Sequence, residues 1–113
     1  TFGHALEKYF HYEKYTHGEA VAMGMVFVAE LSSMLGYCHE DVVQKIRALV
    51  TRYHLPADWP QVEPEKIKNT VLLDKKAQTN DLYLVLIRDI GDAVLEKFPK
   101  QRIEEWIDEK LNH

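Results

Sequence analysis

The sequence predicts a mainly α-helical domain with one small β-hairpin, and three observations support this fold class. Apolar residues recur three and four residues apart in several separate segments of the 113-residue chain, which is helical spacing. One such segment, residues 17–35, is apolar nearly all round, as expected of a helix at the centre of a domain. An apolar run over residues 82–87, a turn at Gly91 and a shorter run over 94–98 predict the two strands of the hairpin.

The first two predicted helices flank a short polar and aromatic loop. Residues 3–11 carry apolar side chains at helical spacing and predict a short helix. Thr16 follows the loop and suits an N-cap, and Glu19 stands three residues later, as in a capping box. The helix over 17–35 should therefore begin directly after Thr16 and stop at Gly36.

Three more helices are predicted further along the chain. Residues 39–53 are amphipathic, Pro64 suits the first turn of a helix over 64–73, and residues 99–113 form an amphipathic closing helix. The inward face predicted for the segment 39–53 consists of Val42, Val43, Ile46, Leu49, Val50 and Tyr53. A polar connection separates the helix over 64–73 from the hairpin.

Composition excludes some classes of partner. The chain is 46% hydrophobic, and its net charge of −4 without a basic, aromatic face argues against nucleic acid. The longest apolar stretch is interrupted by Glu30 and is shorter than the roughly 20 residues needed to cross a bilayer, so no membrane partner is expected. The single cysteine, Cys38, cannot form an internal disulfide, which is consistent with a reducing compartment such as the cytoplasm.

The chain begins without an initiator methionine, a signal peptide or a transit sequence. Thr1 and Phe2 lead directly into GHALEKYF, which already has helical spacing. A natural domain seldom begins inside a motif, so we expect residues 1–113 to be one domain of a longer protein.

Two histidines stand beside glycines at predicted helix starts. His17 opens an apolar helix, where an imidazole could reach a cleft and serve as one of about three ligands of a catalytic zinc ion. His4 precedes it by 13 residues. Glu7 and Glu19 could orient these rings or could face solvent. A helix cap and a surface histidine would give the same pattern, so the residues alone leave both interpretations open.

Lys75 and Lys76 follow Asp74 at the end of the predicted helix over 64–73. Adjacent lysines there complement the negative end of the helix dipole, and they could also provide point charges for a phosphate group. The three methionines, Met23, Met25 and Met34, are interpreted as core packing.

Four segments together resemble the C-terminal half of 3-dehydroquinate synthase. They are GHALE at 3–7, HGEAVAMGM at 17–25, DKK at 74–76 and IGDAVL at 90–95. That family carries GHxxGHAxE, HGEAVAxGM, DKK before a strand and an IG turn, in the same order. HGE before an apolar helix also occurs in glycerol dehydrogenases and related polyol enzymes, so the GHALE and DKK matches favour the synthases. The resemblance implies the helical C-terminal domain of the dehydroquinate synthase-like fold.

The resemblance also implies roles for particular residues. His17 matches the zinc ligand at the head of HGEAV, and His4 matches the second histidine of GHxxGH, which lies near the substrate phosphate. Lys75 and Lys76 match the segment in which one lysine binds that phosphate, with Lys75 preferred. His4, Lys75 and Lys76 are thus the candidate catalytic and substrate-binding residues. We expect His17 to lie at a cleft near all three.

The same resemblance implies that essential parts lie outside these residues. The first GH of the motif, with a second zinc ligand, would directly precede Thr1, and the third ligand and the NAD-binding domain would lie further upstream. The five glycines are too scattered for a dinucleotide loop, so no cofactor-binding residue is expected in the chain. We expect the fragment alone to be inactive and to bind zinc weakly.

Members of this family are lyases that convert the keto acid DAHP to 3-dehydroquinate in the shikimate pathway, which leads to chorismate and the aromatic amino acids. They use NAD and Zn²⁺ or Co²⁺, and they are usually homodimers. The alternatives are another sugar-phosphate cyclase, a glycerol dehydrogenase-like polyol enzyme or, in a different class, a non-catalytic helical interaction module.

Overall fold

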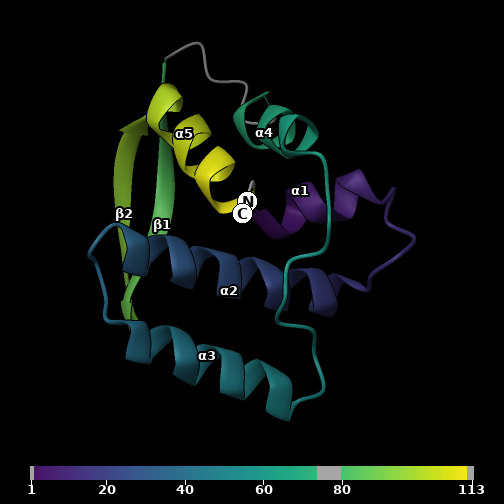
Figure 1. The fold of residues 1–113 in the computed structure, drawn as a ribbon, viewed down its shortest axis with the longest axis vertical. Helices are drawn as coiled ribbons and strands as arrows, with labels where there is room; N and C mark the ends of the chain where they lie inside the picture. Colours follow the sequence, from purple (N-terminus) through teal and green to yellow (C-terminus); the bar gives the residue numbers. More distant parts are fainter. Residues whose placement is uncertain (1, 74–79, 112–113) are drawn as a thin grey trace.

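The computed structural model describes residues 2–73 and 80–111, whose arrangement Figure 1 shows. This part of the chain folds into five helices and one two-stranded antiparallel sheet. The helices are α1 (Phe2–Tyr9), α2 (His17–Met34), α3 (Glu40–Arg52), α4 (Pro64–Leu73) and α5 (Lys100–Leu111), and the strands are β1 (Asp81–Asp89) and β2 (Asp92–Pro99). The predicted fold class is confirmed, and the element ends differ from the predicted ones by no more than two residues.

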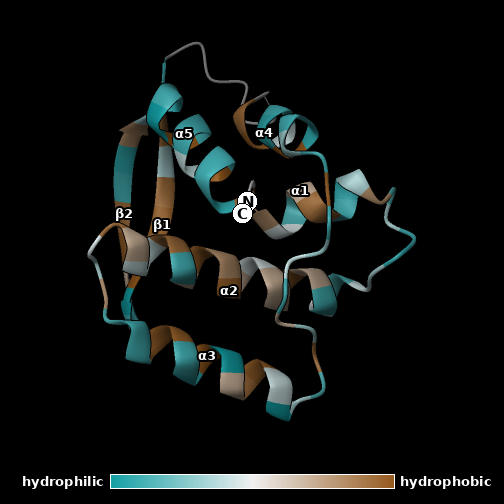
Figure 2. Ribbon diagram, viewed as in Figure 1, coloured by the Kyte–Doolittle hydropathy of each residue, from teal (hydrophilic) through white to brown (hydrophobic). Residues whose placement is uncertain are grey.

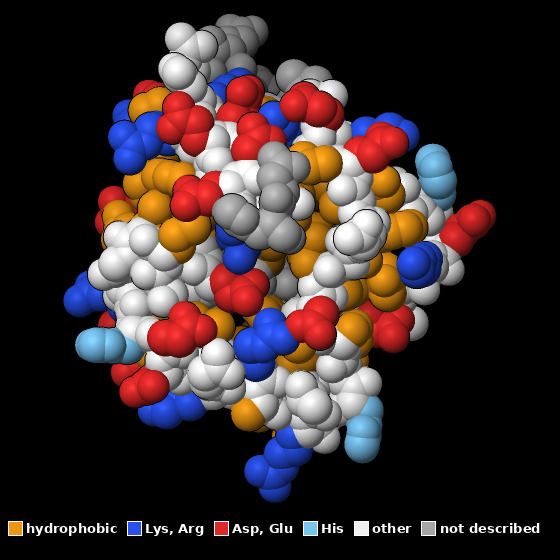
Figure 3. All heavy atoms as spheres, viewed as in Figure 1, with side chains coloured by type: hydrophobic (Ala, Val, Ile, Leu, Met, Phe, Trp, Pro, Cys, Tyr) orange, Lys and Arg blue, Asp and Glu red, His pale blue; other side chains and the backbone are white. Residues whose placement is uncertain are grey.

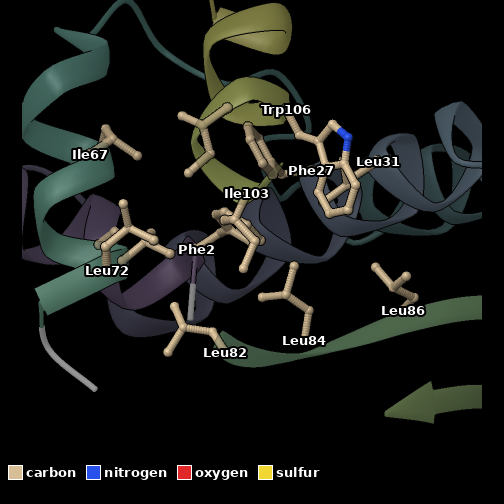
Figure 4. Packing of buried hydrophobic residues seen from close by; sticks show 13 residues of the cluster. Phe2, Phe27, Leu31, Ile67, Leu72, Leu82, Leu84, Leu86, Ile103 and Trp106 are labelled. Atoms are coloured by element: carbon tan, nitrogen blue, oxygen red, sulfur yellow. The ribbon is translucent and has the colours of Figure 1, made fainter. Parts of the chain in front are cut away.

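Helix α2 lies at the centre of the fold and contacts α1, α3 and β1 (Figure 1). Phe27 and Leu31 of α2 belong to a large buried cluster that also contains residues of α1, α4, α5 and β1 (Figure 4). Ala22, Val26 and Ala29, on another face of α2, belong to a smaller cluster with α3. The prediction that the apolar helix is central is therefore confirmed.

One face of α2 remains exposed although it is apolar. Val21 is 41% exposed and Met25, one turn later, is 43% exposed, whereas Met23 is only 1% exposed. Met34, at the end of the helix, is 40% exposed. The interpretation of the methionines as core packing is thus correct for Met23 and wrong for the other two, because Met25 lies on the exposed side of α2 with Val21 and Met34 is the last residue of the helix. Of the described helices, none is both long and apolar enough to span a membrane.

Helix α3 buries a narrower stripe than predicted. Val43, Ile46 and Val50 are buried against α2, but Leu49 is 46% exposed and Tyr53 is 69% exposed. Figure 2 shows the difference between the two helices, since apolar colours dominate α2 while brown and teal alternate along α3. The inward placement predicted for Leu49 and Tyr53 is wrong, because α3 lies at the edge of the fold and packs mainly on α2.

Ion pairs connect the central helix to its neighbours at the surface. Glu30 Oε2 of α2 lies 3.5 Å from Arg47 Nη1 of α3, and Glu30 Oε1 lies 3.1 Å from Lys110 Nζ of α5. On the face shown in Figure 3, acidic and basic side chains are interspersed. Partly exposed pairs of this kind contribute about 0–1 kcal/mol each, so the two apolar clusters stabilise the arrangement far more than these contacts do.

The hairpin presents one face to the core and one to solvent. Leu82, Leu84 and Leu86 of β1 are buried in the larger cluster, whereas Tyr83 and Val85 between them are more than half exposed. The side-chain period of a strand is two, so alternate residues must face opposite sides. The run is apolar on both sides, and the sequence therefore gave no sign of which face is buried.

The two ends of α2 are closed by side-chain and backbone hydrogen bonds. The Glu19 backbone N–H donates to Thr16 Oγ1 at 3.1 Å, and the Thr16 N–H donates to Glu19 Oε1 at 2.8 Å, which completes the predicted capping box. Gly36 follows the helix with φ +85°, and its N–H donates to the Ser33 carbonyl oxygen at 3.1 Å. Both predicted helix ends are therefore confirmed.

Helix α3 ends in a similar turn without a glycine. His54 has φ +61°, and its N–H donates to the Thr51 carbonyl oxygen at 2.9 Å. Because a side chain is strained in this left-handed backbone, His54→Gly should stabilise the chain by about 0.5–1 kcal/mol. Gly36→Ala should destabilise it by about 1 kcal/mol for the same reason. The midpoints of urea unfolding measure both, and a His54→Gly chain less stable than the parent would contradict the expectation.

Helices α1 and α2 approach so closely that their backbones nearly touch. A Cβ atom placed on Gly24 would lie 2.8 Å from the Gly3 backbone N and 3.0 Å from its Cα. A Cβ atom on Gly3 would lie 2.8 Å from the Ala20 carbonyl oxygen. Both positions therefore require glycine, and this contact holds the polar residues of α1 beside the first turn of α2.

Candidate functional site

A cleft of about 400 Å³ lies where α1, α2 and β1 meet. Its polar side chains are those of His4, Glu7 and His17. Its apolar side chains are those of Phe2 from α1, of Val21, Met25 and Val28 from α2, and of Val85 and Ile87 from β1. The exposed apolar face of α2 thus forms one wall of this cleft. The polar side chains that could bind a metal lie next to that wall.

His17 is the first residue of α2, and its side chain is 80% exposed. The capping box immediately before it fixes where the helix begins, so the backbone of His17 is held although its ring faces solvent. The ring Nδ1 lies 3.3 Å from Glu7 Oε2 and 3.4 Å from Glu7 Oε1. Contact with a carboxylate at Nδ1 leaves Nε2 as the nitrogen that can bind a metal.

Glu7 comes from the other helix of the cleft and is far less exposed than its partner. Its side chain is 13% exposed, and the preceding residue, Leu6, is fully buried in the core. Glu7 follows His4 by three residues, so both side chains lie on one face of α1. Of the two glutamates that could orient an imidazole, the structure places Glu7 against His17, while Glu19 closes the capping box.

His4 lines the same cleft as His17 and lies near an aromatic ring that sequence reasoning did not identify. The ring centroids of His4 and Tyr12 are 6.4 Å apart. Tyr12 and the preceding His11 have φ values of +60° and +56°, so two consecutive residues without a glycine adopt the left-handed conformation. Such strained backbone is concentrated at functional sites. No local sequence signal marks this turn.

The two candidate lysines belong to the segment 74–79, which the structure does not describe. Lys75 and Lys76 lie outside the described residues, which resume at Asn80. Helix α4 ends at Leu73, directly before the DKK segment in the sequence. Their assignment to a phosphate therefore stays a prediction.

The donor set in the cleft fits one arm of a metal site rather than a complete one. Within residues 2–73 and 80–111, no three His, Cys, Asp or Glu side chains are grouped so that they could hold a metal ion. His17 is an imidazole backed by a carboxylate, which is the usual environment of a zinc-binding histidine.

Cys38 lies away from the cleft, partly buried beside the α2–α3 cluster. Burial raises the pKa of its thiol, and the carboxylates of Glu40 and Asp89 raise that pKa further. The thiol therefore stays protonated near neutral pH and is a poor nucleophile. Its position agrees with the role of a small residue at the edge of the core.

Comparison with known proteins connects this geometry to a family. The family described as 3-dehydroquinate synthase C-terminal matches residues 1–77, which include α1, α2 and the DKK segment. The chain is 38% identical over 107 residues to the 3-dehydroquinate synthase of Clostridium acetobutylicum, covering 95% of this chain and 30% of that protein. It is 39% identical over 103 residues to the enzyme of Thermoanaerobacter pseudethanolicus, covering 91% and 29%.

A solved structure shares the fold. The chain superposes on 2-deoxy-scyllo-inosose synthase, solved with carbaglucose-6-phosphate, NAD⁺ and Co²⁺, with a TM-score of 0.77 and 26% identity. The match covers 96% of this chain and 31% of that one. The chain thus has the fold of about a third of a synthase that was solved with a sugar-phosphate analogue, NAD⁺ and Co²⁺.

More particularly, the chain belongs to the 3-dehydroquinate synthase C-terminal family. It spans slightly less than a third of the length of the curated relatives it matches.

Proposed function

We propose that this chain is the C-terminal, metal- and substrate-binding domain of a 3-dehydroquinate synthase, a lyase that converts DAHP to 3-dehydroquinate with loss of phosphate. The observation that carries this proposal is the His17–Glu7 pair at the head of α2, in a cleft that His4 also lines. The family match and the identity to curated synthases support the same activity. The NAD-binding domain and the other metal ligands belong to the remainder of the protein.

Each candidate residue has a chemical role in this proposal. His17 holds Zn²⁺ or Co²⁺ through Nε2, and the metal, when bound, polarises the substrate oxygen and lowers its pKa. His4 and Lys75 or Lys76 donate to the phosphate and stabilise its negative charge as it leaves. The apolar wall of α2 and β1 keeps water away from the reacting carbons. A cytoplasmic homodimer is the expected form of the whole enzyme.

A second candidate function is the cyclisation of a different sugar phosphate. The structural match to 2-deoxy-scyllo-inosose synthase favours it, because that enzyme was solved with a sugar-phosphate analogue. The identity to that protein is 26%, against 37–40% for the curated 3-dehydroquinate synthases, so DAHP remains the preferred substrate.

The full-length protein that contains this sequence should release phosphate from DAHP with no net consumption of NAD. The reason is that NAD is reduced and then reoxidised within one turnover. Phosphate release and absorbance at 340 nm, followed in parallel, measure this. Release from glucose 6-phosphate but not from DAHP would favour the second candidate, and net NADH formation from glycerol would favour a polyol dehydrogenase. A non-catalytic interaction module would release no phosphate from either substrate and would bind neither NAD nor metal.

A further inference from the structure

We propose that Glu7 is a positioning residue that fixes the tautomer and the orientation of the His17 imidazole. This inference rests on the proposed function, in which His17 holds the metal. It goes further because it assigns a role to Glu7 of α1, which contacts the metal-binding histidine and not the metal itself.

The contact between the two side chains has the geometry of an acceptor facing a ring N–H. Both carboxylate oxygens of Glu7 lie near Nδ1 of His17, at 3.3 and 3.4 Å. An ionised carboxylate can only accept, so in the neutral imidazole Nδ1 carries the proton and Nε2 keeps its lone pair. The free imidazole in water has no such constraint, and the contact therefore selects the tautomer that can coordinate through Nε2.

The exposure of the two side chains shows which one is fixed by the fold. His17 is 80% exposed and meets few neighbours, whereas Glu7 is 13% exposed. Glu7 is anchored by α1, because Ala5 and Leu6 beside it are fully buried and Gly3 touches the backbone of α2. Glu7 is thus the partner that the fold holds in place, and the exposed imidazole takes its direction from it.

Glu19 provides a matched control because it is a second carboxylate beside the first turn of α2. Its Oε1 accepts from the Thr16 N–H, and its own N–H donates to Thr16 Oγ1. A glutamine at this position preserves the capping box, because Gln can accept the same hydrogen bond. Glu19→Gln therefore removes one negative charge near His17 while it leaves the ring contact and the helix start intact.

The experiment uses the full-length protein, stripped of metal and labelled with ¹⁵N-histidine, at about pH 8, above the ordinary pKa of free imidazole. In the parent, the ¹⁵N shifts of His17 should report a protonated Nδ1. Glu7→Ala should shift the proton to Nε2 and lower Zn²⁺ affinity, measured by chelator competition, about 10–100-fold. Glu7→Gln should recover part of both effects because its amide oxygen can accept from Nδ1. Glu19→Gln should change neither.

Two results would overturn the inference. One is a protonated Nε2 in the parent, and the other is a Glu7→Ala protein with unchanged shifts and unchanged Zn²⁺ affinity. An equal loss of affinity in Glu19→Gln would also count against it, because the effect would then come from charge alone. His17→Ala separates this inference from the proposed function. If His17→Ala retains full Zn²⁺ affinity, the metal role of His17 is wrong, whereas loss in His17→Ala without loss in Glu7→Ala refutes only the role of Glu7.

Discussion

Replacing His17 with alanine in the full-length protein is expected to lower Zn²⁺ affinity by more than about 100-fold and to abolish phosphate release from DAHP at limiting zinc. Loss of a residue that merely supports a ligand already costs about 10–100-fold, so loss of the ligand itself should cost more. Chelator competition gives the affinity, and a phosphate assay over a range of zinc concentrations gives the activity.

His39 provides the control for this substitution. It also stands at a helix start, as the N-cap of α3, but its side chain makes no capping hydrogen bond and does not line the cleft. His39→Ala should therefore leave the Zn²⁺ affinity and the rate of phosphate release within about twofold of the parent values, as is usual for an exposed residue without specific contacts. Equal effects of the two substitutions would mean that His17 has no special role.

Replacing Gly24 with alanine is expected to destabilise the chain by up to about 2 kcal/mol although alanine is the better helix former. The new Cβ would meet the backbone N and Cα of Gly3 at 2.8 and 3.0 Å, and backbone atoms cannot move aside as a flexible side chain can. Overpacking of this kind costs about 1–3 kcal/mol, and the gain in helix propensity of about 1 kcal/mol offsets only part of it. The midpoint of urea unfolding measures the difference.

Gly18 is the matched position for this test. It lies in the first turn of the same helix, and a Cβ there would meet no atom within 4 Å. Gly18→Ala should therefore leave stability equal or slightly higher.

In the full-length protein, Gly24→Ala should also weaken Zn²⁺ binding, because separating α1 from α2 moves Glu7 away from His17. A Gly24→Ala chain as stable as Gly18→Ala would show that the two helices are not in tight contact.

Local signals predicted the elements of the fold well. The capping box of Thr16 and Glu19 and the turn at Gly36 are encoded by residues a few positions apart, so the bounds of the central helix could be derived directly. Pro64 and the helical spacing after it placed α4 at its observed residues. Contacts within one helical turn depend little on the remainder of the fold, which is why these predictions agree with the structure.

Tertiary relations were harder to derive. Glu7 and Glu19 were equivalent candidates to orient an imidazole, and the crossing of α1 and α2 at Gly3 and Gly24 decides between them. That crossing brings together residues 21 positions apart. A glycine within a predicted helix does not by itself indicate that another helix packs closely against it. The turn that brings Tyr12 near His4 was equally hard to predict from the sequence, because neither His11 nor Tyr12, the two residues with positive φ, is a glycine.

The exposed face of α2 was mispredicted for another reason. Hydrophobicity predicts that a side chain prefers to be buried, but it does not indicate which part of the protein covers that side chain. Val21 and Met25 face the cleft instead of the core, and nothing in the described part of the chain covers them. An apolar helix in a domain that spans less than a third of its relatives can have faces whose neighbours belong to other parts of the protein.

The position of His17 in the first turn of α2 has an electrostatic consequence. The unpaired backbone N–H groups of a helix start carry about half a positive elementary charge, which repels a cation. A divalent ion held by His17 would meet this field directly. The carboxylate of Glu7, which lies 3.3 Å from the ring Nδ1, places negative charge beside that helix start. This charge offsets the helix dipole locally, so a cation can approach a place where a bare helix would favour an anion.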